Sequence, residues 1–196
     1  MRHPEASHSP AETSYLTPAR ASLDSQFADN DHLILAVSST RTGRLYVWSR
    51  ERYQDGRIGP AKLVFPTNRL RRGDNHITAG QGIRIPEDSD DPPVLELVRK
   101  PGQSTEEVIV IVAPKRLEGV AEGAPIPASQ IAQWQKQWSS VVRQIDAKDR
   151  LTMTHGEATT LAGMGGGEAI MPQRFYELRA DQGSNLMVAF PLVFTH

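Results

Sequence analysis

The loop formed by residues 68–74 carries three arginines, Arg69, Arg71 and Arg72. Guanidinium groups bind the oxygens of phosphate, sulfate and carboxylate groups through paired hydrogen bonds, so arginines that converge could hold an acidic small ligand. A solvated turn whose charges keep an edge strand from pairing with other chains accounts for the same residues. We favour the solvated turn, and we retain the three arginines and the nearby His76 as candidate binding residues.

The six histidines are the natural place to look for a metal ligand or a general base. Neither the His-x-His nor the His-x-x-x-His spacing of a metal site occurs among them. The chain has no cysteine, which removes thiolate ligands, thiol nucleophiles and disulfides. We therefore assign no catalytic residue and no metal ligand, and we expect no cofactor. Only folding could bring His76 and His155 together.

Two loops contain residues that suit a bound ion, but each lacks part of the known motif. The acidic run at residues 87–91 could attract calcium, yet it lacks the glycine and the final glutamate of an EF-hand loop. The glycine-rich run at residues 163–167 could approach a phosphate, yet it lacks the Lys-Ser or Lys-Thr pair of a P-loop. We expect a hydrated loop in the first case and a strand connection in the second.

The elements that position these candidate side chains are short apolar runs separated by turn residues. This pattern is typical of β-strands. The runs at residues 32–37 and 45–48 flank a turn at residues 41–44, which predicts a hairpin. Pro191 interrupts the last run, which predicts an edge strand or a bulge there. Further strands are expected at residues 62–65, 81–85, 94–99, 107–112, 151–155, 174–178 and 186–194.

One segment has helical periodicity instead. Apolar side chains recur at steps of three and four from Ile131 to Ile145, which predicts an amphipathic helix over residues 129–148. Trp134 and Trp138 lie on its apolar face. They could form an exposed stacking platform for a sugar, but the aliphatic residues on the same face favour packing against a sheet.

Residues 1–28 are rich in Ser, Pro, Ala and Thr, which predicts a flexible N-terminal arm or linker. The few apolar residues of this arm could also dock on a sheet edge or on a neighbouring subunit. Residues 29–196 are expected to form a single β-rich domain that includes the helix. The predicted fold class is mainly β, sandwich-like and antiparallel, with one long amphipathic helix, and α+β is the alternative.

Charge and hydropathy restrict the partners. The chain has 22 basic and 23 acidic residues and a net charge of -1, so no overall field attracts it to nucleic acid. No apolar run approaches the roughly 20 residues of a membrane helix, and we expect no membrane insertion. The first residues do not have the pattern of a signal peptide. A periplasmic or exported location fits if a leader has been removed, and a cytoplasmic location fits otherwise.

A series of short motifs in residues 45–114 carries a resemblance to a known family. The motifs are Leu45-Tyr46-Val47, Leu63-Val64-Phe65-Pro66, Asp74-Asn75, Ala79-Gly80 and Ile85-Pro86. In this order and spacing they resemble the bacterial family called domain of unknown function 4384. Thr67 and His76 stand where that family tends to have Asn and Arg, and residues beyond Leu117 have no counterpart in it. The resemblance implies a sensing or binding module and supplies no catalytic residue.

Three functions remain compatible with the sequence. We favour a non-catalytic binding or interaction module of a bacterial envelope or signalling system, with a protein partner, self-association or an acidic small ligand. An alternative is a subunit of a larger assembly, in which the arm or the strand at residues 186–194 adds to a neighbouring sheet. The last is a hydrolase whose site is assembled only in space, for example from His155 with Glu157 or Glu168.

Overall fold

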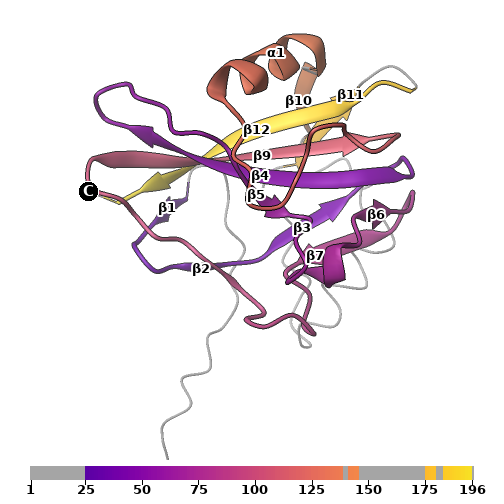
Figure 1. Ribbon diagram of the computed structural model, residues 1–196, viewed down its shortest axis with the longest axis horizontal. Helices are drawn as coiled ribbons and strands as arrows, with labels where there is room; N and C mark the ends of the chain where they lie inside the picture. The colour runs from indigo at the N-terminus through magenta and orange to yellow at the C-terminus, as the bar shows by residue number, and fades with distance from the viewer. Residues whose placement is uncertain (1–24, 139–140, 146–174, 180–182, 196) are drawn as a thin grey trace, which may run out of the picture.

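A six-stranded sheet forms the centre of the chain in the computed structural model, which describes residues 25–138, 141–145, 175–179 and 183–195 (Figure 1). Its strands follow the order β1-β12-β9-β4-β5, and β6 pairs with the beginning of β4. β1 runs parallel to β12, and the other neighbours are antiparallel. The strands are β1 (Gln26–Phe27), β4 (Gly43–Tyr53), β5 (Lys62–Phe65), β6 (His76–Ile77), β9 (Gln103–Ala113) and β12 (Leu186–Phe194).

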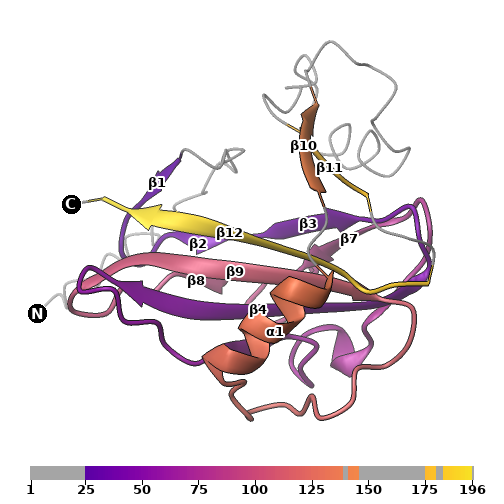
Figure 2. The ribbon, with the colours of Figure 1, turned by 90° about the horizontal axis from the view of Figure 1, so that it is seen from above.

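Smaller elements accompany the main sheet. They are the antiparallel pairs β2 (His32–Leu33) with β8 (Leu95–Glu96), β3 (Leu35–Ser38) with β7 (Gly82–Ile85), and β10 (Val141–Ile145) with β11 (Phe175–Arg179), the 3-10 turn η1 (Arg71–Gly73) and the helix α1 (Ala128–Trp138). In Figure 1 the helix lies above the main sheet, and β2, β3 and β7 lie below it. Figure 2 shows the helix crossing over β4. The prediction of a mainly β fold with one helix is confirmed for the described residues.

Both faces of the main sheet are buried. Because successive side chains of a strand point to opposite faces, Leu45 and Val47 of β4 pack below the sheet, whereas Tyr46 and Trp48 pack above it. The lower cluster also includes Phe65 and aliphatic residues of β9 and β12. The continuous apolar runs at residues 45–48 of β4 and 108–113 of β9 therefore follow from burial on both sides.

The helix covers the upper face through Ile131 and Trp134. The ring of Trp134 lies 5.6 Å from that of Trp48 and 5.0 Å from that of Trp138, which confirms packing on the sheet. The predicted end at residue 148 is wrong, because α1 ends at Trp138 and residues 141–145 form strand β10. Ser139 and Ser140 interrupt the helix-forming sequence, and the β-branched residues that follow favour a strand.

The predicted hairpin between residues 32–37 and 45–48 is also wrong. Residues 32–37 fall into two short strands, of which β2 pairs with β8 and β3 pairs with β7. β4 instead pairs with β9 along one edge and with β5 and β6 along the other. Since both edges of β4 are occupied, β3 must find its partner elsewhere.

The end of the predicted arm belongs to the main sheet. Gln26 and Phe27 form β1, and Phe27 is buried in the lower cluster, so these two residues of the expected arm are part of the main sheet. The alternative of docking on a sheet edge holds for these two residues. Residues 1–24, the strand expected at residues 151–155 and the glycine-rich run at 163–167 lie outside the described residues. No helix in the described part is long and apolar enough to span a membrane.

Candidate functional site

The arginine-rich loop at residues 68–74 and the acidic run at residues 87–91 contact each other, although the sequence analysis considered them as separate candidate sites. Arg71 Nε lies 2.8 Å from Glu87 Oε1, and the backbone N–H of Arg71 donates to Asp90 Oδ1 at 3.0 Å. Arg69 Nε donates to the carbonyl oxygen of Asp91 at 3.2 Å. Arg69 and Arg71 are therefore used, at least in part, to join the two loops.

The remaining two candidates from the sequence, Arg72 and His76, belong to the same region of the chain. Arg72 and His76 are exposed, and the carbonyl oxygen of His76 accepts a hydrogen bond from Arg71. Anion binding at this loop stays a prediction, as does the hydrolase that would use His155, which lies outside the described residues. Within the described ranges no group of three or more His, Asp or Glu side chains could hold a metal ion.

The motif residue Asn75 has a structural role. Its side chain donates to the carbonyl oxygen of Leu45 at 3.1 Å and accepts from Arg44 at 3.1 Å. The backbone N–H of Leu45 donates to the carbonyl oxygen of Asn75 at 2.9 Å. These bonds attach the loop before β6 to the beginning of β4.

A cavity of about 290 Å³ lies below the main sheet, between its strands and the segment that carries β2 and β8. Its volume is at the lower end of the range found for small-molecule sites. Most of its wall is aliphatic, and it includes Leu33, Val47, Leu95, Leu97, Val108 and Leu192. We call this cavity the lower pocket.

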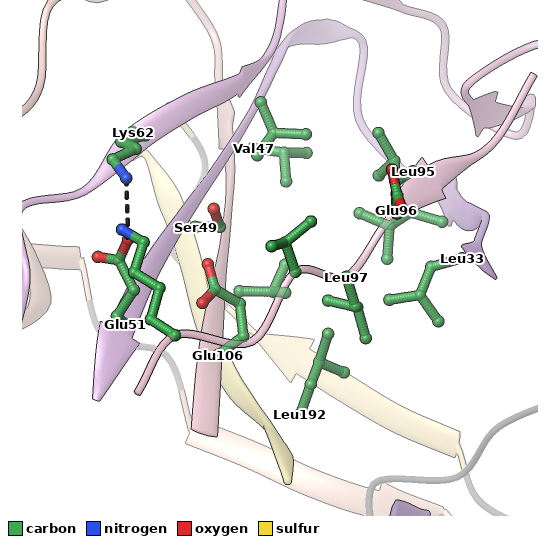
Figure 3. Close-up of a pocket in the computed structure, with 15 residues that line it drawn as sticks. Leu33, Val47, Ser49, Glu51, Lys62, Leu95, Glu96, Leu97, Glu106 and Leu192 are labelled. Carbon is green, nitrogen blue, oxygen red and sulfur yellow. Dashed lines mark hydrogen bonds and ion pairs between the residues drawn. The ribbon is translucent and has the colours of Figure 1, made fainter. Parts of the chain in front are cut away.

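The polar residues of the lower pocket gather at one end because of strand alternation. Val47, Ser49 and Glu51 occupy successive inward positions of β4, so the wall changes from apolar to charged along the strand. On β9 the same change runs from Val108 to Glu106, which is paired with Glu51 in the strand register. Figure 3 shows the leucines on one side of the pocket and the pair of Glu51 and Lys62 on the other.

Glu51 is a buried anion held by two lysines. Lys62 Nζ lies 2.8 Å from Glu51 Oε1, and Lys100 Nζ contacts the same oxygen. Burial alone would raise the pKa of Glu51, but the hydrogen bonds from Lys100 and Lys62 outweigh it and lower the pKa to about 2. Gly59 leaves room for this carboxylate, since a Cβ there would collide with Glu51 Oε2.

The pKa of Glu106 is shifted in the opposite direction to that of Glu51. Burial raises the pKa of Glu106, and the negative charge of Glu51 adds to the increase. Hydrogen bonds from Ser49 and Gln103 offset part of it, with Gln103 Nε2 2.6 Å from Glu106 Oε2. In Figure 3 the carboxyl group of Glu106 points toward Ser49, between Glu51 and the leucines. Two neighbouring carboxyl groups thus differ in how readily they hold a proton.

Sequence reasoning missed this pocket. Glu51 and Glu106 are far apart in the chain, and their proximity follows only from the pairing of β4 with β9. The alternation of Val47, Ser49 and Glu51 was visible, but a strand end that becomes polar is equally typical of a strand leaving the core.

Comparison with known proteins does not assign a family. No protein-family model matches the chain, and no curated protein and no solved structure matches it either. The geometry of the lower pocket is therefore the main support for a functional proposal.

Proposed function

We propose that this chain is a non-catalytic binding module whose lower pocket holds a small molecule with an apolar body and one polar head. The observation that carries the proposal is the distribution of its lining residues. An aliphatic wall surrounds the cavity, and Ser49, Glu51 and Glu106 converge at one end with two lysines. Specific small-molecule sites combine a mostly apolar wall with a few convergent polar groups in this way.

The size of the cavity limits the ligand and its affinity. A volume of about 290 Å³ suits a short aliphatic chain or a single ring. Each buried CH₂ group contributes about 0.8 kcal/mol, and the loss of translational and rotational freedom offsets much of the sum. We therefore expect a six-carbon probe to bind weakly, with a dissociation constant of about a millimolar or higher.

The biological setting of the module is part of the proposal. The resemblance of residues 45–114 to domain of unknown function 4384 supports a bacterial envelope or signalling system, and it depends on motif residues such as Asn75 and Ile85. A periplasmic or exported location would suit a module that senses small molecules.

Titration with hexan-1-ol tests the binding function. We expect saturable binding to the unchanged chain, measured by calorimetry, and at least about tenfold weaker binding to Val64→Trp. Val64 lines the pocket and is half-buried, so the indole would fill the cavity without displacing the innermost core. The matched control is Val188→Trp, on the same face of the sheet but outside the pocket lining, which should bind as the unchanged chain does.

The second candidate is a subunit of a larger assembly, and the edge of β12 favours it. Within the described residues, β1 is the strand that covers the outer edge of β12, and it does so only at Val193 and Phe194. The outer edge from Leu186 to Leu192 could accept a strand from another chain.

A further inference from the structure

Two consecutive glutamates of β9 have different surroundings. Glu107 points above the sheet and forms ion pairs with Arg50 and Arg52, the second at 2.5 Å. Glu106 points below the sheet into the lower pocket, and no lysine or arginine of the described residues forms an ion pair with it. The structure thus neutralises one carboxylate internally and leaves the other facing the cavity.

The lysines near Glu106 are shared with Glu51. The charge of Lys62 lowers the pKa of Glu106, but this effect is smaller than that of burial, which raises it. Lys62 of β5 and Lys100 both bind the oxygen of Glu51 on β4, so their nearest partner is already in place. Glu96 of β8 adds a third carboxylate to the lining. Three carboxylates and two ammonium groups leave the fully ionised pocket with one excess negative charge.

A carboxylate that is partly removed from water needs either a proton or a cation. Because burial raises the pKa of Glu106, this carboxyl group holds a proton more readily than a carboxyl group in solution. A ligand with a positive head would remove the need for that proton. A ligand with a negative head would be repelled by Glu106.

On the basis of the function proposed above, we propose that the ligand of the lower pocket carries a cationic head, an ammonium or a guanidinium group, which pairs with Glu106 while its apolar body contacts the leucine wall. This assigns the site to small amphipathic amines. Ser49 is placed to accept a hydrogen bond from the same head, since its side chain lines the pocket beside Glu106.

Three probes that share a six-carbon chain and differ in their polar group test this assignment. Hexylamine, hexan-1-ol and hexanoate are titrated separately into the full chain near neutral pH, where the amine is protonated. We expect hexylamine to bind roughly tenfold more tightly than hexan-1-ol, because a hydrogen bond between charged groups is stronger than one between neutral groups. Hexanoate should bind more weakly than hexan-1-ol.

Two variants test whether the preference for the amine depends on Glu106. In Glu106→Gln the preference for hexylamine over hexan-1-ol should disappear, so that the two probes bind to this variant equally well. Glu96→Gln is the matched control, because Glu96 is exposed at the pocket lining, and it should retain most of the preference for the amine. The affinity for hexylamine should also rise as the pH rises through the pKa of Glu106.

Each failure has its own meaning. Equal binding of the three probes, or tighter binding of hexanoate, overturns the cationic head and leaves the binding pocket intact. A preference for the amine that survives in Glu106→Gln overturns the role of Glu106. Binding of none of the three probes overturns the pocket itself, and with it the proposed function.

Discussion

Glu51 and Glu106 lie next to each other on β4 and β9, yet their environments move their pKa values in opposite directions. For Glu51 the two lysines decide the outcome, because each donates a hydrogen bond to the ionised form. For Glu106 burial is the larger effect and raises the pKa, because the groups that donate hydrogen bonds to it, Ser49 and Gln103, are neutral. Such opposed shifts are typical of functional sites, where charge is arranged for a ligand rather than for stability alone.

Replacing each carboxyl group by an amide should therefore change stability with opposite sign at pH 7. Because the folded-state pKa of Glu51 is lowered, its stabilising contribution is present above pH 4.5 and is lost as the pH falls through about 2. Glu51→Gln should lower the free energy of unfolding by about 2 kcal/mol at pH 7. Urea denaturation as a function of pH measures this change.

Glu106→Gln is the reciprocal variant. Because the folded-state pKa of Glu106 is raised, the ionised group opposes folding at a pH above that value, and the penalty disappears below pH 4.5. The amide should make the chain more stable at pH 7 and leave it unchanged at pH 3.5. A decrease in stability at pH 7 would show that the ionised form of Glu106 is well accommodated.

At the residue scale, the sequence predicted the bonding groups but not their partners. Arg71 and Glu87 were each recognised as able to bind an ion, and the fold pairs them with each other. Nothing in the sequence marks Lys62 and Lys100 as pocket residues, since isolated lysines are usual on a protein surface. A cross-strand contact such as that of Glu51 with Lys62 depends on sheet topology, which local patterns do not contain.

The helix α1 is the element that seals the upper face. Its two tryptophans extend a row of rings that begins with Tyr46 and Trp48, stacked 5.5 Å apart. The lower pocket lies on the other side of β4, so Val47 faces the pocket while its neighbours Tyr46 and Trp48 contact the upper layer. Packing of the helix thus helps to hold the strand that forms the pocket wall.

Trp134→Ala should lower the free energy of unfolding by about 3 kcal/mol, because it leaves a cavity above Trp48. Lys136→Ala, at an exposed position of the same helix, should change it by less than about 0.5 kcal/mol. Urea denaturation of both variants measures the two effects. Similar small losses would mean that α1 contributes little to the fold.

A predicted helix or strand is accurate where the periodicity of its apolar residues, its side-chain types and its flanking turns all indicate the same element. The strands at residues 62–65 and 186–194 were predicted with their observed bounds, since apolar residues and flanking turns both mark them. The second half of the predicted helix failed because the positions of Val141 and Ile145 fit a helical repeat while their β-branched side chains favour a strand. Tertiary pairing with β11 is consistent with the strand.

At the scale of the whole molecule, the two proposed functions predict different masses in solution. Light scattering of the full chain and of a variant lacking residues 1–24 separates them, and this deletion leaves β1 in place. The binding-module proposal predicts a monomer near 21.7 kDa for the full chain and no change of state on deletion. A larger assembly that dissociates on deletion would favour the second proposal, in which the arm adds to a neighbouring sheet.

The central claim is that the lower pocket is a binding site, and mapping of hexan-1-ol by amide resonances tests it most directly. The account predicts saturable shifts at Val47, Val108 and Leu192, on three strands that meet at the pocket, with little change in α1 on the opposite face. Shifts confined to α1 or to the loop at residues 68–74, or no shifts at millimolar probe, would contradict it.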